Sequence, residues 1–101
     1  MKKDEPIWTR ITDREEFCRL FADRRLKGNG MEFTIFADGR MEGLIGNSEL
    51  TGRWHWEDGF FCRTARLDGE DLGTDWEVIE TDGVRMRYVR DKGRGEGSIV
   101  S

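Results

Sequence analysis

The sequence predicts an α+β fold in which one N-terminal helix packs on a bent antiparallel meander of six or seven strands. Five dipeptides of the Asn-Gly or Asp-Gly type divide the chain, and such pairs favour tight hairpin turns because both residues tolerate positive φ. They occupy positions 29–30, 38–39, 58–59, 68–69 and 82–83. The segments between them alternate apolar and polar residues, which is typical of strands. A capping-box string followed by helically spaced apolar residues predicts the single helix.

The first expected elements are a lead-in and the helix. Residues 1–10 are rich in charge, and we expect an extended segment there. A helix is expected over residues 13–27, and Gly28 can end it. At its start, the Thr12 hydroxyl and the Glu15 carboxylate can satisfy each other's free amide groups. The apolar face of this helix, which should cover the apolar side of the sheet, carries Phe17, Leu20 and Phe21.

The remaining chain, residues 31–100, is expected to form the meander. Its strands are predicted at 31–37, 40–46, 49–57, 60–67, 72–80, 84–90 and 95–100. Such a sheet either closes into a small barrel or wraps to protect its edges. Because there is no linker and no internal repeat, residues 1–101 are interpreted as a single domain.

The turn at residues 58–59 predicts the register of the two strands that it joins. A two-residue loop places Glu57 opposite Phe60, and the pairing then propagates backwards along both strands. The further expected pairs are Trp56 with Phe61, His55 with Cys62, Trp54 with Arg63, Gly52 with Ala65, and Leu50 with Leu67. The apolar sides of the two strands match in this register, which supports it.

The next hairpin is expected to turn through a three-residue loop at 81–83. This loop gives the better match of apolar residues on the inner side of the sheet. The expected pairs are Trp76 with Tyr88, Val78 with Met86, and on the outer side Glu77 with Arg87.

Composition and charge restrict the possible partners. The chain of 101 residues carries 21 carboxylates against 17 Lys and Arg, and its net charge of −4 disfavours nucleic acid as a partner. No run approaches the ~18 apolar residues of a membrane span, so no membrane partner is expected. If residue 1 is the natural start, the lack of a signal-peptide core predicts the cytoplasm, and a processed periplasmic chain is the alternative. Two cysteines are too few for a disulfide framework.

The candidate ligand-binding residues are Trp54, Arg63, Trp76 and Tyr88. An aromatic pocket that contains one cation could bind a small organic anion. The alternative explanation is a core in which Arg63 stacks on Trp54 through a cation–π contact.

His55 and Cys62 are expected to lie opposite each other, with Glu57 two residues along the strand. A zinc site needs three or four ligands, and a cysteine nucleophile needs a base that a third group orients. Since only two ligands meet in this register, ordinary cross-strand neighbours are expected rather than a metal site or a catalytic residue. No Gly-rich loop follows a strand and opens a helix, so no nucleotide or other cofactor is expected.

The string from Gly52 to Arg63 reads G-R-W-H-W-E-D-G-F-F-C-R. It resembles the central G-x-W-x-W-x-D-G-[YF]-[YF]-C-R signature of a family of small bacterial proteins. Some of these proteins carry the label dihydrodipicolinate reductase, but a reductase of that kind needs a dinucleotide-binding βαβ unit, which a meander does not provide. The family is therefore treated as uncharacterised and the label as a misassignment.

Two departures from the family pattern bear on the cysteines. The family resemblance implies a signal peptide and a second cysteine on the strand occupied here by Trp76, and this sequence lacks both. Both absences suit a member that works in a reducing compartment, where a disulfide does not form. A disulfide from Cys62 to Cys18 stays open if the helix packs near that strand.

Two hypotheses for the function follow. The first is a non-enzymatic binding module that takes a small ligand or a peptide at an aromatic and arginine-lined mouth of the sheet. The alternative is a protein-interaction or self-associating structural protein that pairs through a sheet face or an edge strand. We expect a monomer or a weak homodimer, and no enzymatic activity.

Overall fold

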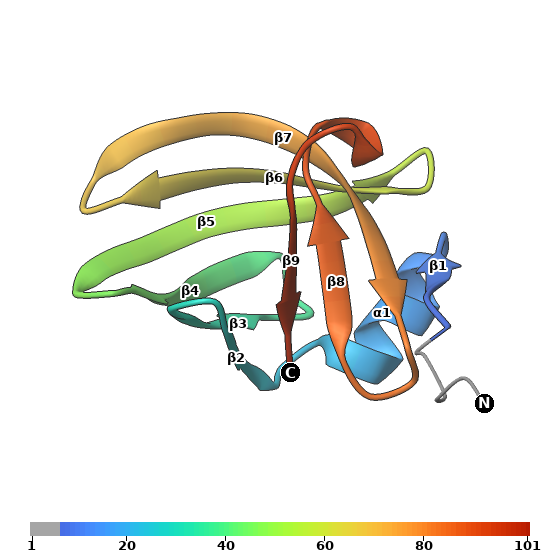
Figure 1. The fold of residues 1–101 in the computed structure, drawn as a ribbon. Helices are drawn as coiled ribbons and strands as arrows, with labels where there is room; N and C mark the ends of the chain where they lie inside the picture. Colours follow the sequence, from blue (N-terminus) through green and yellow to red (C-terminus); the bar gives the residue numbers. More distant parts are fainter. Residues whose placement is uncertain (1–6) are drawn as a thin grey trace.

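The computed structural model describes residues 7–101, which form nine strands, one α-helix and one short 3₁₀ turn. Eight strands form an antiparallel meander in the order β2-β3-β4-β5-β6-β7-β8-β9, which curls into a nearly closed barrel (Figure 1). The strands are β1 (Thr9–Ile11), β2 (Arg25–Gly28), β3 (Met31–Ile35), β4 (Arg40–Ile45), β5 (Ser48–Glu57), β6 (Phe60–Leu67), β7 (Glu70–Thr81), β8 (Met86–Val89) and β9 (Gly97–Val100). The α-helix is α1 (Arg14–Phe21), and the 3₁₀ turn is η1 (Asp91–Gly93). The α+β meander is confirmed, but the expected number of six or seven strands was too low.

Strand β1 joins the N-terminal segment to the sheet. Residues 1–6 of the expected lead-in lie outside the described residues. The following part is extended and pairs with β7, where Ile11 lies opposite Ile79. Both side chains are buried, so this segment contributes to the core.

Helix α1 is shorter than the expected 13–27. Asp13, rather than Thr12, caps it, because Oδ2 of Asp13 accepts a hydrogen bond from the Glu16 amide at 3.3 Å. The acidic residues of its first turn, Glu15 and Glu16, stabilise the helix because the N-terminal end of the helix dipole is positive. No helix within the described residues is long and apolar enough to cross a membrane.

The residues beyond the helix form strand β2 instead of further helical turns. Asp23 takes a φ of 62°, and its amide donates to the Ile35 carbonyl at 2.8 Å, which turns the chain into the sheet. Leu26 then lies opposite Phe33, and both side chains are buried. Burial of Leu26 and pairing with β3 thus override a helical spacing, since tertiary contacts outweigh local propensity.

The β5–β6 hairpin has the register that the sequence predicts. All six expected pairs are present, from Glu57 with Phe60 to Leu50 with Leu67. Because side chains alternate along a strand, Trp54 and Arg63 point to the inner side of the barrel. His55 and Cys62 share the outer side.

The β7–β8 hairpin differs from the expected register. The loop has four residues, 82–85, because the Asp82 carboxylate accepts the amides of Val84 at 3.0 Å and Arg85 at 2.7 Å. The observed pairs are Val78 with Val89, Ile79 with Tyr88, Glu80 with Arg87, and Thr81 with Met86. The predicted three-residue loop was therefore wrong, as were its three pairs, Trp76 with Tyr88, Val78 with Met86 and Glu77 with Arg87. Arg87 instead forms an ion pair with Glu80 at 2.6 Å.

The barrel closes where the last strand meets the first strand of the meander. The Lys27 amide donates to the Ser101 carbonyl at 2.8 Å, and the Ser101 amide donates to the Lys27 carbonyl at 2.9 Å. Gly28 lies at this junction, and a Cβ atom there would come within 2.4 Å of the Ile99 carbonyl oxygen. Only glycine therefore allows the two strands to approach so closely.

Helix α1 covers one end of the barrel, near the β5–β6 and β7–β8 turns (Figure 1). Phe17 is completely buried, and its ring centroid lies 5.3 Å from those of Trp54 and Trp56 and 5.4 Å from that of Phe61. The β4–β5 and β6–β7 turns lie on the far side of the molecule from α1 (Figure 1). The segment between β8 and β9, which contains η1, folds back toward the β5–β6 turn, where Nζ of Lys92 lies 5.5 Å from the centroid of the Phe60 ring.

Candidate functional site

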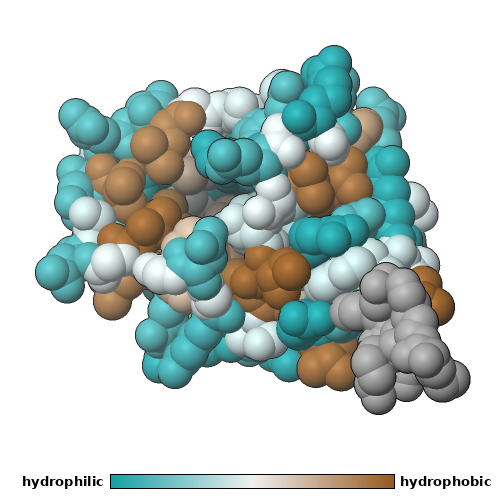
Figure 2. All heavy atoms as spheres, in the orientation of Figure 1, coloured by the Kyte–Doolittle hydropathy of each residue, from teal (hydrophilic) through white to brown (hydrophobic). Residues whose placement is uncertain are grey.

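A cavity of about 370 Å³ occupies the interior of the barrel. Its walls are mainly apolar and come from inward-pointing positions of six successive strands, β3 to β8. They include Met31, Phe33, Ile35, Leu50, Ile79 and Met86. The more exposed part of its lining, which we take as its mouth, includes Asn29, Ile45, Leu72, Arg90 and Glu96. Apolar side chains also gather over the left of the molecule in Figure 2, where the long β4–β5 and β6–β7 hairpins end in Figure 1.

Arg63 and Glu77 form an ion pair in the wall of this cavity. Nε of Arg63 lies 3.4 Å from Oε2 of Glu77, and Nη2 of Arg63 lies 3.9 Å from Oδ2 of Asp75. Nη1 of Arg63 also donates to the Gly73 carbonyl at 3.2 Å. The guanidinium thus contacts three residues of β7 that lie on the inner side. Glu77 is only 4% exposed, so this pair is largely shielded from water.

Burial changes the acidity of Glu77. Loss of hydration raises the pKa of its carboxyl from an ordinary 4.5 to about 7, while Arg63 opposes the shift and the Asp75 carboxylate adds to it. Near neutral pH, the carboxyl is therefore present in both protonation states. It can accept a hydrogen bond when ionised and donate one when protonated.

Tyr88 lines the same cavity from strand β8. Its hydroxyl lies 3.4 Å from Sδ of Met31, and its ring meets Phe33 edge-on with centroids 6.3 Å apart. Burial is the main cause that raises the pKa of the Tyr88 phenol. The hydroxyl therefore stays protonated at neutral pH and can donate a hydrogen bond.

The structure brings together two of the four residues that the sequence analysis proposed. Arg63 and Tyr88 both line the cavity. Trp54 lies under α1 at the covered end of the barrel, where its Nε1 donates to the Phe36 carbonyl at 2.7 Å. Trp76 lies opposite Cys62 and therefore on the outer side of the sheet.

The alternative explanation was a core in which Arg63 stacks on Trp54, and the structure shows a different cation on this ring. Trp54 is indeed part of the core at 5% exposure, but the cation over its ring is Arg14, with the guanidinium carbon 5.0 Å from the centroid. Arg63 is held by the carboxylates of β7 instead.

Sequence reasoning missed Asp75 and Glu77 as members of the site. The segment from Trp76 to Ile79 carries apolar residues on both faces, so alternation alone does not decide which side faces inward. An inward-pointing arginine needs a buried counter-charge, and the two acidic residues at alternate positions of the next strand were the available signal.

The outer side of the barrel holds a second group of polar side chains around Cys62. Nε2 of His55 lies 2.8 Å from Oε1 of Glu57, and the side-chain ligand atoms of these two residues and of Cys62 lie within 4.8 Å of one another. Both Cys18 and Cys62 have free thiols. Burial, followed by nearby carboxylates, raises the pKa of the Cys62 thiol.

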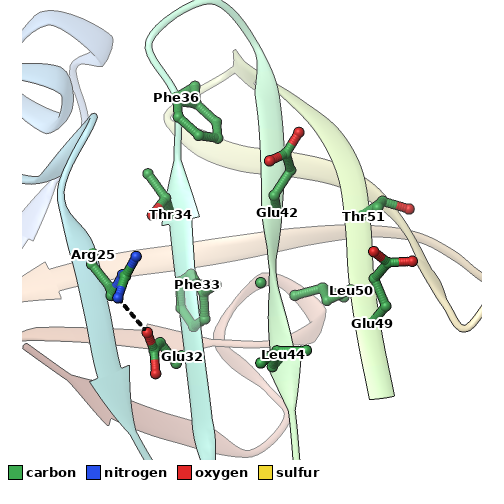
Figure 3. Close-up of a pocket in the computed structure, with 11 residues that line it drawn as sticks. Arg25, Glu32, Phe33, Thr34, Phe36, Glu42, Leu44, Glu49, Leu50 and Thr51 are labelled. Carbon is green, nitrogen blue, oxygen red and sulfur yellow. Dashed lines mark ion pairs between the residues drawn. The ribbon is translucent and has the colours of Figure 1, made fainter. Parts of the chain in front are cut away.

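A further hollow of about 500 Å³ lies on the outer side of strands β2 to β5 (Figure 3). Glu32, Glu42 and Glu49 line it, and Arg25 forms an ion pair with Glu32 at 3.0 Å. Its lining is rich in carboxylates, whereas the interior cavity combines apolar walls with a few convergent polar groups. The interior cavity is therefore the better candidate for a small-molecule site.

Comparisons of the chain with protein-family models, with curated proteins and with solved structures found no match. The fold and its cavity alone therefore define the class of protein: a small meander barrel that is covered by a helix at one end and encloses a cavity. The family likeness of the string from Gly52 to Arg63 stays a prediction from the sequence.

Proposed function

We propose that this protein is a non-enzymatic binding module that takes a small, mostly apolar molecule into the barrel. The single observation that carries the proposal is the apolar cavity with Arg63 and Glu77 in its wall. Eight-stranded barrels have interiors that side chains fill or that hold one small ligand. A volume of about 370 Å³ falls within the usual range of small-molecule sites.

The charges in the wall restrict the polar group of the ligand. Arg63 already faces two carboxylates, so its charge is offset before any ligand enters. A neutral hydrogen-bonding group suits this site, because Glu77 and Tyr88 can each serve as its partner. The small organic anion considered from the sequence would bind only where Glu77 is protonated, since ionised Glu77 and Asp75 would repel it.

The proposal is tested with N-phenyl-1-naphthylamine, a neutral apolar fluorophore whose emission rises in apolar surroundings. Leu72 lies at the mouth, whereas Leu44 lines the outer hollow of β2 to β5 and not this cavity. Both are 48% exposed, which makes Leu44→Trp a matched control for Leu72→Trp. We expect saturable binding that weakens about tenfold in Leu72→Trp, a loss of ~1.4 kcal/mol, and does not change in Leu44→Trp.

Two outcomes would overturn the proposal. One is the absence of saturable binding to the unmodified protein, with native mass spectrometry of the untagged protein showing no carried ligand that blocks the site. The other is an equal affinity of both variants, which would place the fluorophore outside the barrel.

The alternative function is that of an interaction protein, and the junction of β2 and β9 favours it. Ile99 on β9 is 39% exposed beside this junction, and strand edges bind extended segments of other chains. If the protein associates with itself through this edge, its molar mass measured by light scattering should rise with protein concentration. A constant monomer mass up to millimolar concentration would contradict self-association.

A further inference from the structure

The outer side of the β5–β6 hairpin brings three different metal-ligating groups together. His55 and Glu57 are two residues apart on β5 and therefore share a face, and Cys62 lies directly opposite His55 on β6. One nitrogen, one carboxylate oxygen and one sulfur from this set lie within 4.8 Å of one another. Strand β6, which carries Cys62, is paired with β5 on one side and with β7 on the other, and this pairing fixes the position of the Cys62 backbone.

The distances suit a tetrahedral site after small side-chain rotations. Bonds of ~2.0–2.3 Å from zinc to nitrogen, oxygen and sulfur place neighbouring ligand atoms ~3.3–3.7 Å apart. His55 and Glu57 have side chains that are 61% and 48% exposed, so both can rotate toward the buried sulfur. The required shift is about 1 Å, well within the reach of exposed rotamers.

The charges of the ligand set also suit a divalent cation, because the metal ion replaces the thiol proton of Cys62 when it binds. A thiolate and one carboxylate would then balance the two positive charges of the metal.

We propose that His55, Glu57 and Cys62 bind a divalent transition metal ion, Zn²⁺ in particular, with a water molecule at the fourth position. Mixed nitrogen, sulfur and oxygen ligands suit zinc, whereas magnesium and calcium prefer oxygen alone. The sequence analysis expected no metal because it counted only two ligands, and Glu57 is the third. The site is independent of the barrel cavity, since these side chains point to the opposite side of the sheet.

The test is a titration of the reduced, untagged protein with Co²⁺, followed by displacement with Zn²⁺. Cobalt bound to a thiolate gives a charge-transfer band in the near ultraviolet, which reports on a cysteine ligand. We expect this band to saturate at one equivalent and to disappear when one equivalent of zinc is added. Zinc should also protect Cys62 from alkylation.

Substitutions at exposed positions test the ligands without disturbing the core. His55 is the one histidine of the chain, and His55→Ala and Glu57→Gln should each weaken cobalt binding about tenfold or more, since even outer-shell partners contribute 10–100-fold. Glu49→Gln, an exposed carboxylate further along the same strand, should bind as the unmodified protein does. Circular dichroism shows whether each variant keeps its fold.

Three results would overturn the proposal. Cobalt binding without the charge-transfer band would exclude Cys62 as a ligand. Unchanged affinity in His55→Ala would show adventitious binding elsewhere on the surface. Failure to bind either metal at micromolar concentration would also overturn it.

Discussion

Nε of Arg63 lies 3.4 Å from Oε2 of Glu77 on the inner side of the barrel, and the two residues come from neighbouring strands. Their side chains are 14% and 6% exposed, so water screens this pair only weakly. Such pairs add little net stability compared with apolar residues of similar size, but loss of one partner leaves the other uncompensated. The pair is therefore a sensitive probe of the cavity.

Removal of the Arg63 charge should destabilise the protein in a pH-dependent way. We expect Arg63→Met to lower the free energy of unfolding by about 3 kcal/mol at pH 8, because ionised Glu77 is left buried. The loss should be smaller at pH 5.5, where Glu77 is protonated. Urea unfolding followed by tryptophan fluorescence measures both values. The double variant Arg63→Met/Glu77→Gln should recover most of the loss at pH 8, and no recovery would contradict the assigned partnership.

Glu77 should also make the unmodified protein less stable as the pH rises. The carboxyl has a folded pKa of about 7 against an ordinary 4.5, so between these values the folded state binds more protons than the unfolded state. The stability contribution is fully present below about pH 4.5 and is lost as the pH rises through 7. The total is about 3 kcal/mol as an upper value.

This pH dependence is measured by urea unfolding at intervals from pH 5 to pH 8. Glu77→Gln keeps the shape of the side chain and cannot ionise, so its unfolding free energy should lack this downward slope. Parallel slopes for the two proteins would assign the pH dependence to other groups.

The Asp82 carboxylate should determine the four-residue loop between β7 and β8. It accepts two backbone amides and lies 2.9 Å from Nε of Arg85, and the amides are the main cause that lowers its pKa to about 2. Its contribution is present above the unfolded pKa and is lost as the pH falls toward 2. Asp82→Ala should lower the Tm, whereas Asp82→Asn keeps an oxygen acceptor and should lower it less. Equal Tm values for the two variants would contradict this explanation of the loop.

Strand positions were the most predictable part of the fold. The Asp58-Gly59 turn determined the β5–β6 register because both residues take positive φ and the apolar sides of the strands match in only one alignment. Arg63 could be placed inside the barrel for the same reason. The end of α1 was less predictable, since Leu26 suits the apolar face of a helix as well as that of a strand.

The candidate site was only partly predictable, and β7 shows why. A shift of one position reverses every side chain of a strand, and the four-residue loop moved Glu77 inward and Trp76 outward relative to the expectation. Trp76 and Val78 remain half-buried on the outer side. There η1 provides cover, because Gly93 packs against the Val78 side chain. That contact connects distant parts of the chain, and strand alternation carries no signal of it.

The junction between β2 and β9 should depend on Gly28. A methyl group at this position would come within 2.4 Å of the Ile99 carbonyl oxygen, so the strands would have to separate. Gly28→Ala should therefore break the two hydrogen bonds between Lys27 and Ser101. Amide hydrogen exchange is the direct measurement, and both amides should lose their protection by at least tenfold.

Gly30→Ala is the matched control for this variant. Gly30 lies two residues away with a φ of 77°, and a Cβ atom there would meet no other atom within 4 Å. Its replacement adds backbone strain of about 1 kcal/mol without a steric clash. The Lys27 and Ser101 amides should then keep their protection relative to the rest of the sheet. Equal loss of protection in both variants would show that general destabilisation, rather than the close approach at Gly28, opens the barrel.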